Sequence, residues 1–206
     1  VDFLGSILPG VTGAYGSDYG ASSGTTGAYR FLWGTINLSG ANNTLSGSNV
    51  LAVGAPVRSL SMDGSTQGNA GVTLVLNNSN SYTGGTVVNR GSTLTIQTGG
   101  APGGASPLGS GALEIGNGAV VNVQAATGSL VNASTGTNNN AVIFRPTGLL
   151  NFNNNAIYTG AGGQDRWADD VGMSLNGGEV RLTGFSTAPT TETIGILDVS
   201  NGAGVV

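Results

Sequence analysis

The densest group of side chains that could do chemistry is residues 165–170, which read Asp-Arg-Trp-Ala-Asp-Asp. Three carboxylates within six residues can supply hard oxygen ligands, so Asp165, Asp169 and Asp170 form a candidate calcium site. The alternative is structural, with Arg166 paired to a carboxylate and Trp167 covering the flank of the fold. Replacing Asp169 and Asp170 by Asn separates the two, because a melting temperature unchanged with and without calcium excludes the site.

The rest of the composition leaves little room for catalysis. The chain contains no His, Cys or Lys, which excludes most catalytic triads, thiol proteases and Schiff-base enzymes. Parallel β-helices that cleave polysaccharides use paired carboxylates or a carboxylate-bound cation. Here Glu114, Glu179 and Glu192 fall one per expected turn and are predicted to face solvent. We therefore predict no catalytic residue, no enzyme activity and no cofactor other than the candidate calcium ion.

The elements that position these residues follow a recurring unit, a glycine followed by alternating apolar residues. Copies begin at Gly34, Gly71, Gly91, Gly111, Gly128, Gly148, Gly178 and Gly195. From Gly71 to Gly148 successive copies start 20, 20, 17 and 20 residues apart. Short alternating strands repeated at a fixed period indicate a solenoid. The sequence thus predicts an all-β parallel β-helix with coils of about 20 residues.

The apolar residues predict a column inside the coil. The pairs within residues 74–76, 94–96 and 113–115 are expected at equivalent places in successive coils, with the polar residues between them facing water. Shorter second strands are expected at residues 86–88 and 120–123. Corner asparagines are expected to bond in ladders from coil to coil.

Domain boundaries follow from composition. Residues 34–206 are assigned to the solenoid, with inserted loops near 99–110 and 153–170. Residues 1–33, rich in Gly, Ser and Tyr, are either a linker with aromatic caps or an assembly arm. Such an arm would lay an extended segment along a neighbour's strand edge.

Charge and hydropathy limit the classes of partner that the chain could bind. The net charge is −4 and the six arginines are scattered, so we expect no nucleic-acid partner, because phosphate binding needs clustered cations. No apolar stretch approaches the roughly 20 residues that span a membrane. The absence of Cys fits a secreted bacterial surface protein.

One stretch resembles a known family. Tyr82, Thr83, Gly84, Gly85 and Thr86, followed by Val87, Val88, Gly91 and Leu94, resemble the passenger-associated transport repeat, also called the autotransporter-associated β-strand repeat. The resemblance extends over residues 70–206. It implies a right-handed parallel β-helix displayed outside a Gram-negative-type cell, with Tyr82 stacked over the coil edge to order the turn.

These observations predict an extracellular or cell-surface structural protein without catalytic activity. It would be a β-solenoid rod or a self-assembling filament or sheath subunit, joined end to end or by strand donation. One alternative is a fragment of an adhesin passenger that binds host or glycan surfaces. Another is a carbohydrate-active β-helix enzyme, which needs a groove where carboxylates and aromatic residues converge.

Overall fold

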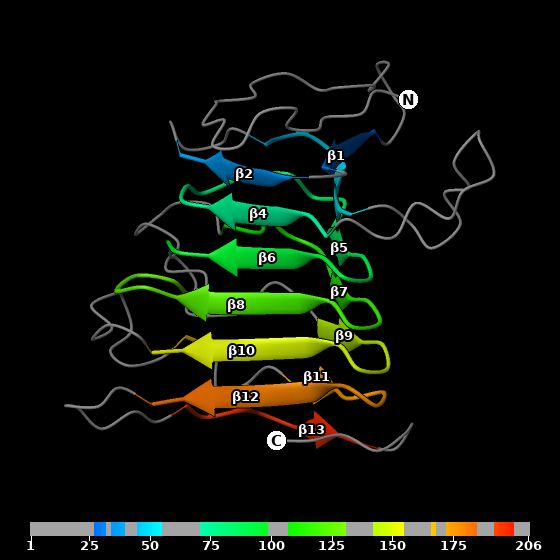
Figure 1. The fold of residues 1–206 in the computed structure, drawn as a ribbon, viewed down its shortest axis with the longest axis vertical. Helices are drawn as coiled ribbons and strands as arrows, with labels where there is room; N and C mark the ends of the chain where they lie inside the picture. The colour runs from blue at the N-terminus through cyan, green and yellow to red at the C-terminus, as the bar shows by residue number, and fades with distance from the viewer. Residues whose placement is uncertain are drawn as a thin grey trace.

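The computed structural model describes residues 27–31, 34–39, 45–54, 71–98, 107–130, 142–154, 166–167, 172–184 and 192–199. Within these residues the protein is all-β, with thirteen strands and no helix (Figure 1). It follows that no described helix could cross a membrane.

The strands form two stacked sheets in which every pairing is parallel. The first sheet has seven strands in the order β1 (Ala28–Phe31), β3 (Val50–Val53), β5 (Thr86–Val88), β7 (Leu113–Ile115), β9 (Val142–Phe144), β11 (Met173–Ser174) and β13 (Leu197–Asp198). The second has six, β2 (Thr35–Leu38), β4 (Thr73–Leu76), β6 (Thr93–Ile96), β8 (Val120–Gln124), β10 (Leu149–Asn153) and β12 (Glu179–Thr183). Odd and even strands alternate between the sheets, as a parallel β-solenoid requires.

In most coils a strand of the seven-stranded sheet is followed by a short corner, a strand of the six-stranded sheet and a longer return. The exception is the second coil, where residues 54–72 separate β3 from β4 and residues 55–70 lie outside the described residues. Within the six-stranded sheet the period near 20 describes one step only, the one by which Thr73 pairs with Thr93. The next register partners are Val120, Leu149 and Glu179, which lie 27, 29 and 30 residues further along at each step. Since the returns differ in length, the coil has no constant residue count.

The predicted equivalence of residues 113–115 with residues 74–76 and 94–96 is wrong. Residues 113–115 form β7, which pairs with β5 in the seven-stranded sheet. The place beside Leu94 and Ile96 belongs to Val121 and Val123. Strands of both sheets carry the same apolar alternation, so the pattern alone could not assign a strand to its sheet.

The core lies between the sheets and is built from columns of stacked side chains. In the six-stranded sheet one column contains Ile36, Leu74, Leu94, Val121, Leu150 and Val180, and the next contains Leu38, Leu76, Ile96, Val123, Phe152 and Leu182. All are buried except Leu182. Successive side chains along these strands therefore face the core and the outside in turn.

Corners that lead from one sheet to the other share one geometry. Three are closed by a turn hydrogen bond, from Ser92 N–H to Asn89 O, Ala119 N–H to Gly116 O and Gly148 N–H to Arg145 O. The third residue of each turn has a positive φ, at Gly91, Gly118 and Thr147. Thr147 is the exception among these, because a β-branched side chain resists the left-handed backbone.

Residues assigned to the arm and the loops are partly described. Residues 28–31 lie within the stretch predicted as an arm, and they form β1, paired in register with β3. Residues 107–110 close a turn against Tyr82, whose carbonyl accepts from Ser110 N–H. Residues 1–26, 99–106, 155–165 and 168–171 lie outside the described residues.

Candidate functional site

The Tyr-Thr-Gly-Gly-Thr motif forms the corner that enters β5. Tyr82 is fully buried among the core residues, so it lies inside the coil rather than over its edge. Its hydroxyl is 2.5 Å from Thr86 Oγ1, itself buried. Burial raises the pKa of the Tyr82 hydroxyl far above its usual range, against a smaller lowering by the Thr86 hydrogen bond. This pair links the two ends of the motif and orders the turn.

The two glycines of the motif are required because backbones of three coils meet there. A Cβ on Gly84 would lie 2.5 Å from Asn49 O in the preceding coil. Gly85 has a φ of +87°, and a Cβ there would lie 2.8 Å from Ala112 O in the following coil. The same backbone bonds to both sides, because Leu51 N–H donates to Gly85 O at 2.9 Å and Thr86 N–H donates to Ala112 O at 2.8 Å. The motif is thus a stacking corner.

The remaining motif residues extend this corner into the sheets. Thr83 is exposed, and its N–H donates to Gly47 O at 2.9 Å. Gly91 takes the left-handed position of the next corner, with a φ of 70°. Leu94 lies in the core column between Leu74 and Val121. These motif residues serve coil-to-coil contacts.

A second polar cluster centres on Arg166, whose side chain is fully buried. Its Nε donates to Asn154 Oδ1 at 2.7 Å, its Nη2 donates to Ala125 O at 2.8 Å, and its Nη1 donates to Gly128 O. Its own carbonyl accepts from Leu130 N–H at 2.9 Å. The guanidinium therefore joins the turn after β8 to the end of β10.

Glu192 holds the same segment from the last coil. Its two carboxylate oxygens accept from the backbone N–H groups of Arg166 at 3.1 Å and Trp167 at 2.8 Å. Trp167 is fully buried and packs edge-on against Phe152, with ring centroids 6.4 Å apart. Trp167 is thus part of the core instead of a cover on its flank. Glu192 is half-buried and bonded, where the sequence predicted a solvated residue.

The other two glutamates of interest face outward as predicted. Glu114 forms an ion pair with Arg145 at 2.8 Å, and Glu179 forms one with Arg181 at 2.6 Å. The Glu114 ion pair raises the pKa of Arg145. Each carboxylate bonds to its own arginine, so the two glutamates do not form a shared site.

The candidate calcium ligands Asp165, Asp169 and Asp170 lie outside the described residues. Within the described part of the chain, no three His, Cys, Asp or Glu residues gather at metal-binding distance. The two residues of that run which are described, Arg166 and Trp167, act as an anchor for the segment.

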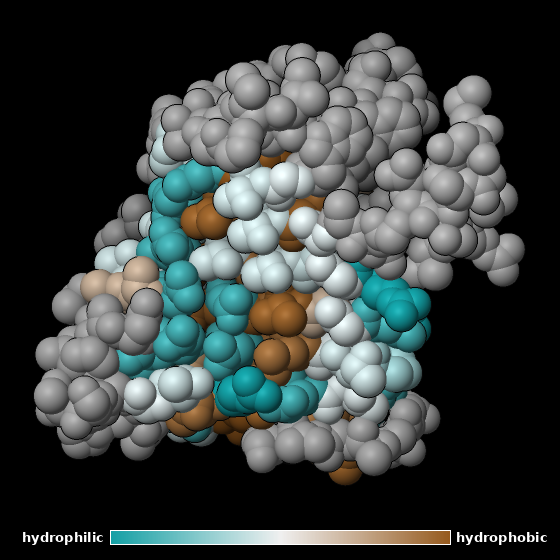
Figure 2. Space-filling view, in the orientation of Figure 1, coloured by the Kyte–Doolittle hydropathy of each residue, from teal (hydrophilic) through white to brown (hydrophobic). Residues whose placement is uncertain are grey.

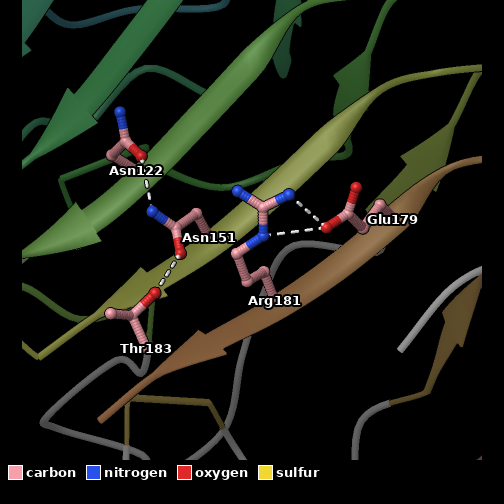
Figure 3. A network of polar contacts seen from close by, with 5 residues as sticks. All are labelled: Asn122, Asn151, Glu179, Arg181 and Thr183. Carbon is pink, nitrogen blue, oxygen red and sulfur yellow. Dashed lines mark hydrogen bonds and ion pairs between the residues drawn. The ribbon is translucent and has the colours of Figure 1, made fainter.

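A side-chain ladder occurs on the outward face of the six-stranded sheet, whereas the corner asparagine Asn89 bonds to a backbone carbonyl instead of to another asparagine. Asn151 Nδ2 donates to Asn122 Oδ1 at 3.0 Å between register partners, and Thr183 Oγ1 donates to Asn151 Oδ1 at 3.2 Å (Figure 3). At a corner, Asn89 Nδ2 donates to Gly54 O of the preceding coil at 2.9 Å. These bonds tie neighbouring coils together.

The outward face of the six-stranded sheet is mainly polar. Figure 2 shows hydrophilic residues beside a small hydrophobic area over β8 and β10, where Val120 and Leu149 are register partners. None of the outward positions on the six strands holds an aromatic residue.

The two ends of the stack differ. At the end formed by β1 and β2, the inward residues Tyr29, Phe31, Ile36 and Leu38 are at most 2% exposed. At the end formed by β12 and β13, four large apolar residues are exposed. They are Leu182 at 44%, Ile196 at 81%, Leu197 at 36% and Val199 at 49%. Edge strands beside exposed apolar residues are a typical site of association.

Comparison of the chain with protein-family models, with curated proteins and with solved structures found no match. The candidate site therefore depends on geometry alone. Sequence reasoning found the motif corner but missed the roles of Glu192 and Asn154.

Proposed function

We infer that the protein is a structural β-solenoid without catalytic activity, exposed outside a bacterial cell as a rod or as a subunit of a filament or sheath. The observation that carries this inference is the pair of continuous parallel sheets, whose last strands among the described residues, β12 and β13, lie beside exposed apolar residues. Such a surface is a typical site of association with another chain.

The polar contacts named above support the same function, because they bond one coil or segment to the next. Arg166 and Glu192 join coils and segments, and the asparagine bonds run from one coil to the next. Glu114 and Glu179 are each neutralised by an arginine. A polysaccharide-cleaving site needs two carboxylates about 5–10 Å apart around a sugar, and nothing in the described residues favours one.

We take the solenoid to be right-handed, because crossovers between parallel strands of one sheet are right-handed in about 98% of cases. The family resemblance of the motif corner implies the same hand and the same location on the cell surface. Diffraction or cryo-electron microscopy of the rods would settle the hand directly.

Electron microscopy of the purified chain, as isolated and after refolding with and without calcium, tests the function. Filaments or sheets with a regular axial repeat are expected. Short isolated rods at every concentration would exclude a self-assembling subunit and leave a surface rod. Release of reducing sugars from a panel of polysaccharides would overturn the assignment as non-catalytic.

A further inference from the structure

Two of the corners that lead from one sheet to the other carry the pair Asn-Gly, at residues 117–118 and 176–177. A third pair, residues 201–202, lies outside the described residues. In an Asn-Gly pair the backbone nitrogen of the glycine can attack the asparagine side chain, because glycine has no Cβ to hinder the approach. The two described corners differ in the freedom and the solvent access that this reaction needs.

The corner at Asn117 leaves the reacting groups free. Its turn is closed by Ala119 N–H, which donates to Gly116 O at 3.0 Å. That bond does not involve the peptide group between Asn117 and Gly118, and neither does any other backbone hydrogen bond among the described residues. Both residues are exposed, and a Cβ on Gly118 would lie 3.9 Å from the nearest atom, Thr147 Oγ1. The peptide group can therefore rotate toward the Asn117 side chain without breaking a backbone bond.

The corner at Asn176 hinders the same reaction. Asn176 is half-buried, and its Oδ1 is fully buried with no hydrogen-bond donor among the described residues. Gly177 O accepts from Thr147 N–H at 2.8 Å, and a Cβ on Gly178 would lie 2.6 Å from the Phe144 ring. Attack on Cγ moves negative charge onto Oδ1, and an oxyanion is stabilised by hydrogen-bond donors. Water can supply such a donor at an exposed asparagine but not at this shielded oxygen.

We propose that Asn117 is a site of spontaneous covalent modification, in which the backbone nitrogen of Gly118 attacks Asn117 Cγ. The nitrogen gives its proton to a base in the solvent and bonds to Cγ. The Cγ–Nδ2 bond then breaks, and Nδ2 takes up a proton and leaves as ammonia. Water opens the resulting succinimide ring, either at Cγ to give aspartate or at the backbone carbonyl to give isoaspartate. One water is consumed and one ammonia released, so the step needs no oxidant and no cofactor.

Either product places a new negative charge between two corners that carry arginine. Arg90 lies in the preceding corner and Arg145 begins the following one, since β5, β7 and β9 are neighbours in register. Isoaspartate also lengthens the backbone of the turn by one carbon atom. This inference goes beyond the proposed function and does not depend on it.

The test is to age the full folded chain in buffer and to locate the converted asparagines by peptide mapping. Trypsin cleaves after Arg90, Arg166 and Arg181 but not before Pro146, so the two pairs fall into separate peptides, residues 91–166 and 167–181. Electron-transfer fragmentation distinguishes aspartate from isoaspartate in each peptide. A second sample is aged in urea, where both corners are unfolded.

In the folded chain Asn117 should convert to both products about a hundredfold faster than Asn176, the order of effect seen when an oxyanion loses one hydrogen-bond donor. In urea the two asparagines should convert at equal rates. Gly118→Ala should slow conversion at residue 117, because the added methyl group hinders the attacking nitrogen. Asn176→Gln is the matched control and should leave that conversion unchanged.

Three outcomes would overturn the proposal. Equal rates for Asn117 and Asn176 in the folded chain would mean that corner geometry does not select the site. Conversion of Asn117 in urea but not in the folded chain would mean that its corner protects it. Aspartate without isoaspartate would exclude attack by Gly118, because direct hydrolysis of the side-chain amide gives aspartate alone.

Discussion

Replacing Arg166 by Met is expected to be the most damaging single change among the polar residues. The guanidinium is fully buried and donates to Asn154 Oδ1, Ala125 O and Gly128 O. Met fills much of the volume but leaves three neutral acceptors, two of them buried, without their donor. An unsatisfied buried acceptor costs about 1–3 kcal/mol. We therefore expect a loss of about 3–5 kcal/mol from the three bonds together.

For a chain of 206 residues such a loss corresponds to a melting temperature lower by about 10 °C, since each kcal/mol shifts it by about 2–4 °C at this length. Thermal unfolding followed by far-ultraviolet circular dichroism, together with urea titration, measures both quantities. Hydrogen exchange should show the loss of protection concentrated in β8 and β10, whose ends the guanidinium joins.

Arg181→Met is the matched control. That side chain is about half exposed and bonds to Glu179 within its own strand, so its loss should cost less than about 1 kcal/mol. If Arg166→Met costs no more than Arg181→Met, the guanidinium does not join the coils energetically and the reasoning is refuted.

Three further changes test the stacking corner and its neighbours. The wild type should lose stability as the pH rises above 10, and Tyr82→Phe should abolish that loss. The raised pKa keeps Tyr82 protonated in the folded chain. The unfolded chain loses this proton above about pH 10 and is thereby stabilised by up to about 1.4 kcal/mol per pH unit. If the urea midpoint falls by the same amount in both proteins between pH 10 and 11, this reasoning is contradicted. Gly85→Ala should cost more than about 2 kcal/mol, since a left-handed backbone alone costs about 1–2 kcal/mol and the Cβ would also meet Ala112 O. Gly118→Ala, where the nearest atom is 3.9 Å away, is its control and should show the backbone cost alone. Thr147→Asn should raise stability by about 0.5–1 kcal/mol, because Asn tolerates the φ of 63° better than Thr; a lower melting temperature would mean that the Thr side chain makes a compensating contact.

Much of the fold was predictable because the alternation of apolar residues is local. A strand shows its buried face through residues two apart, so Leu74 with Leu76 and Leu94 with Ile96 were recognisable as inward pairs. Corner glycines were recognisable as well, since a left-handed backbone excludes most other residues. The all-β class followed from the alternation, while the turn at Gly84 and Gly85 was expected only through the family resemblance of their motif.

Strand partners and side-chain contacts were decided by the tertiary structure. Residues 113–115 and 120–124 have the same pattern, yet the former pair with β5 in the seven-stranded sheet and the latter with β6 in the six-stranded sheet. The contacts of Arg166 and Glu192 likewise span 12 to 41 residues of sequence. Leu182 is exposed, whereas Leu38 and Leu76 in the same column are buried. The sequence does not show this difference, because all three are leucines and only the position of Leu182 in the last described strand of the sheet distinguishes it. Alternation and turn preference act over a few residues, whereas burial depends on what the rest of the chain places against a side chain.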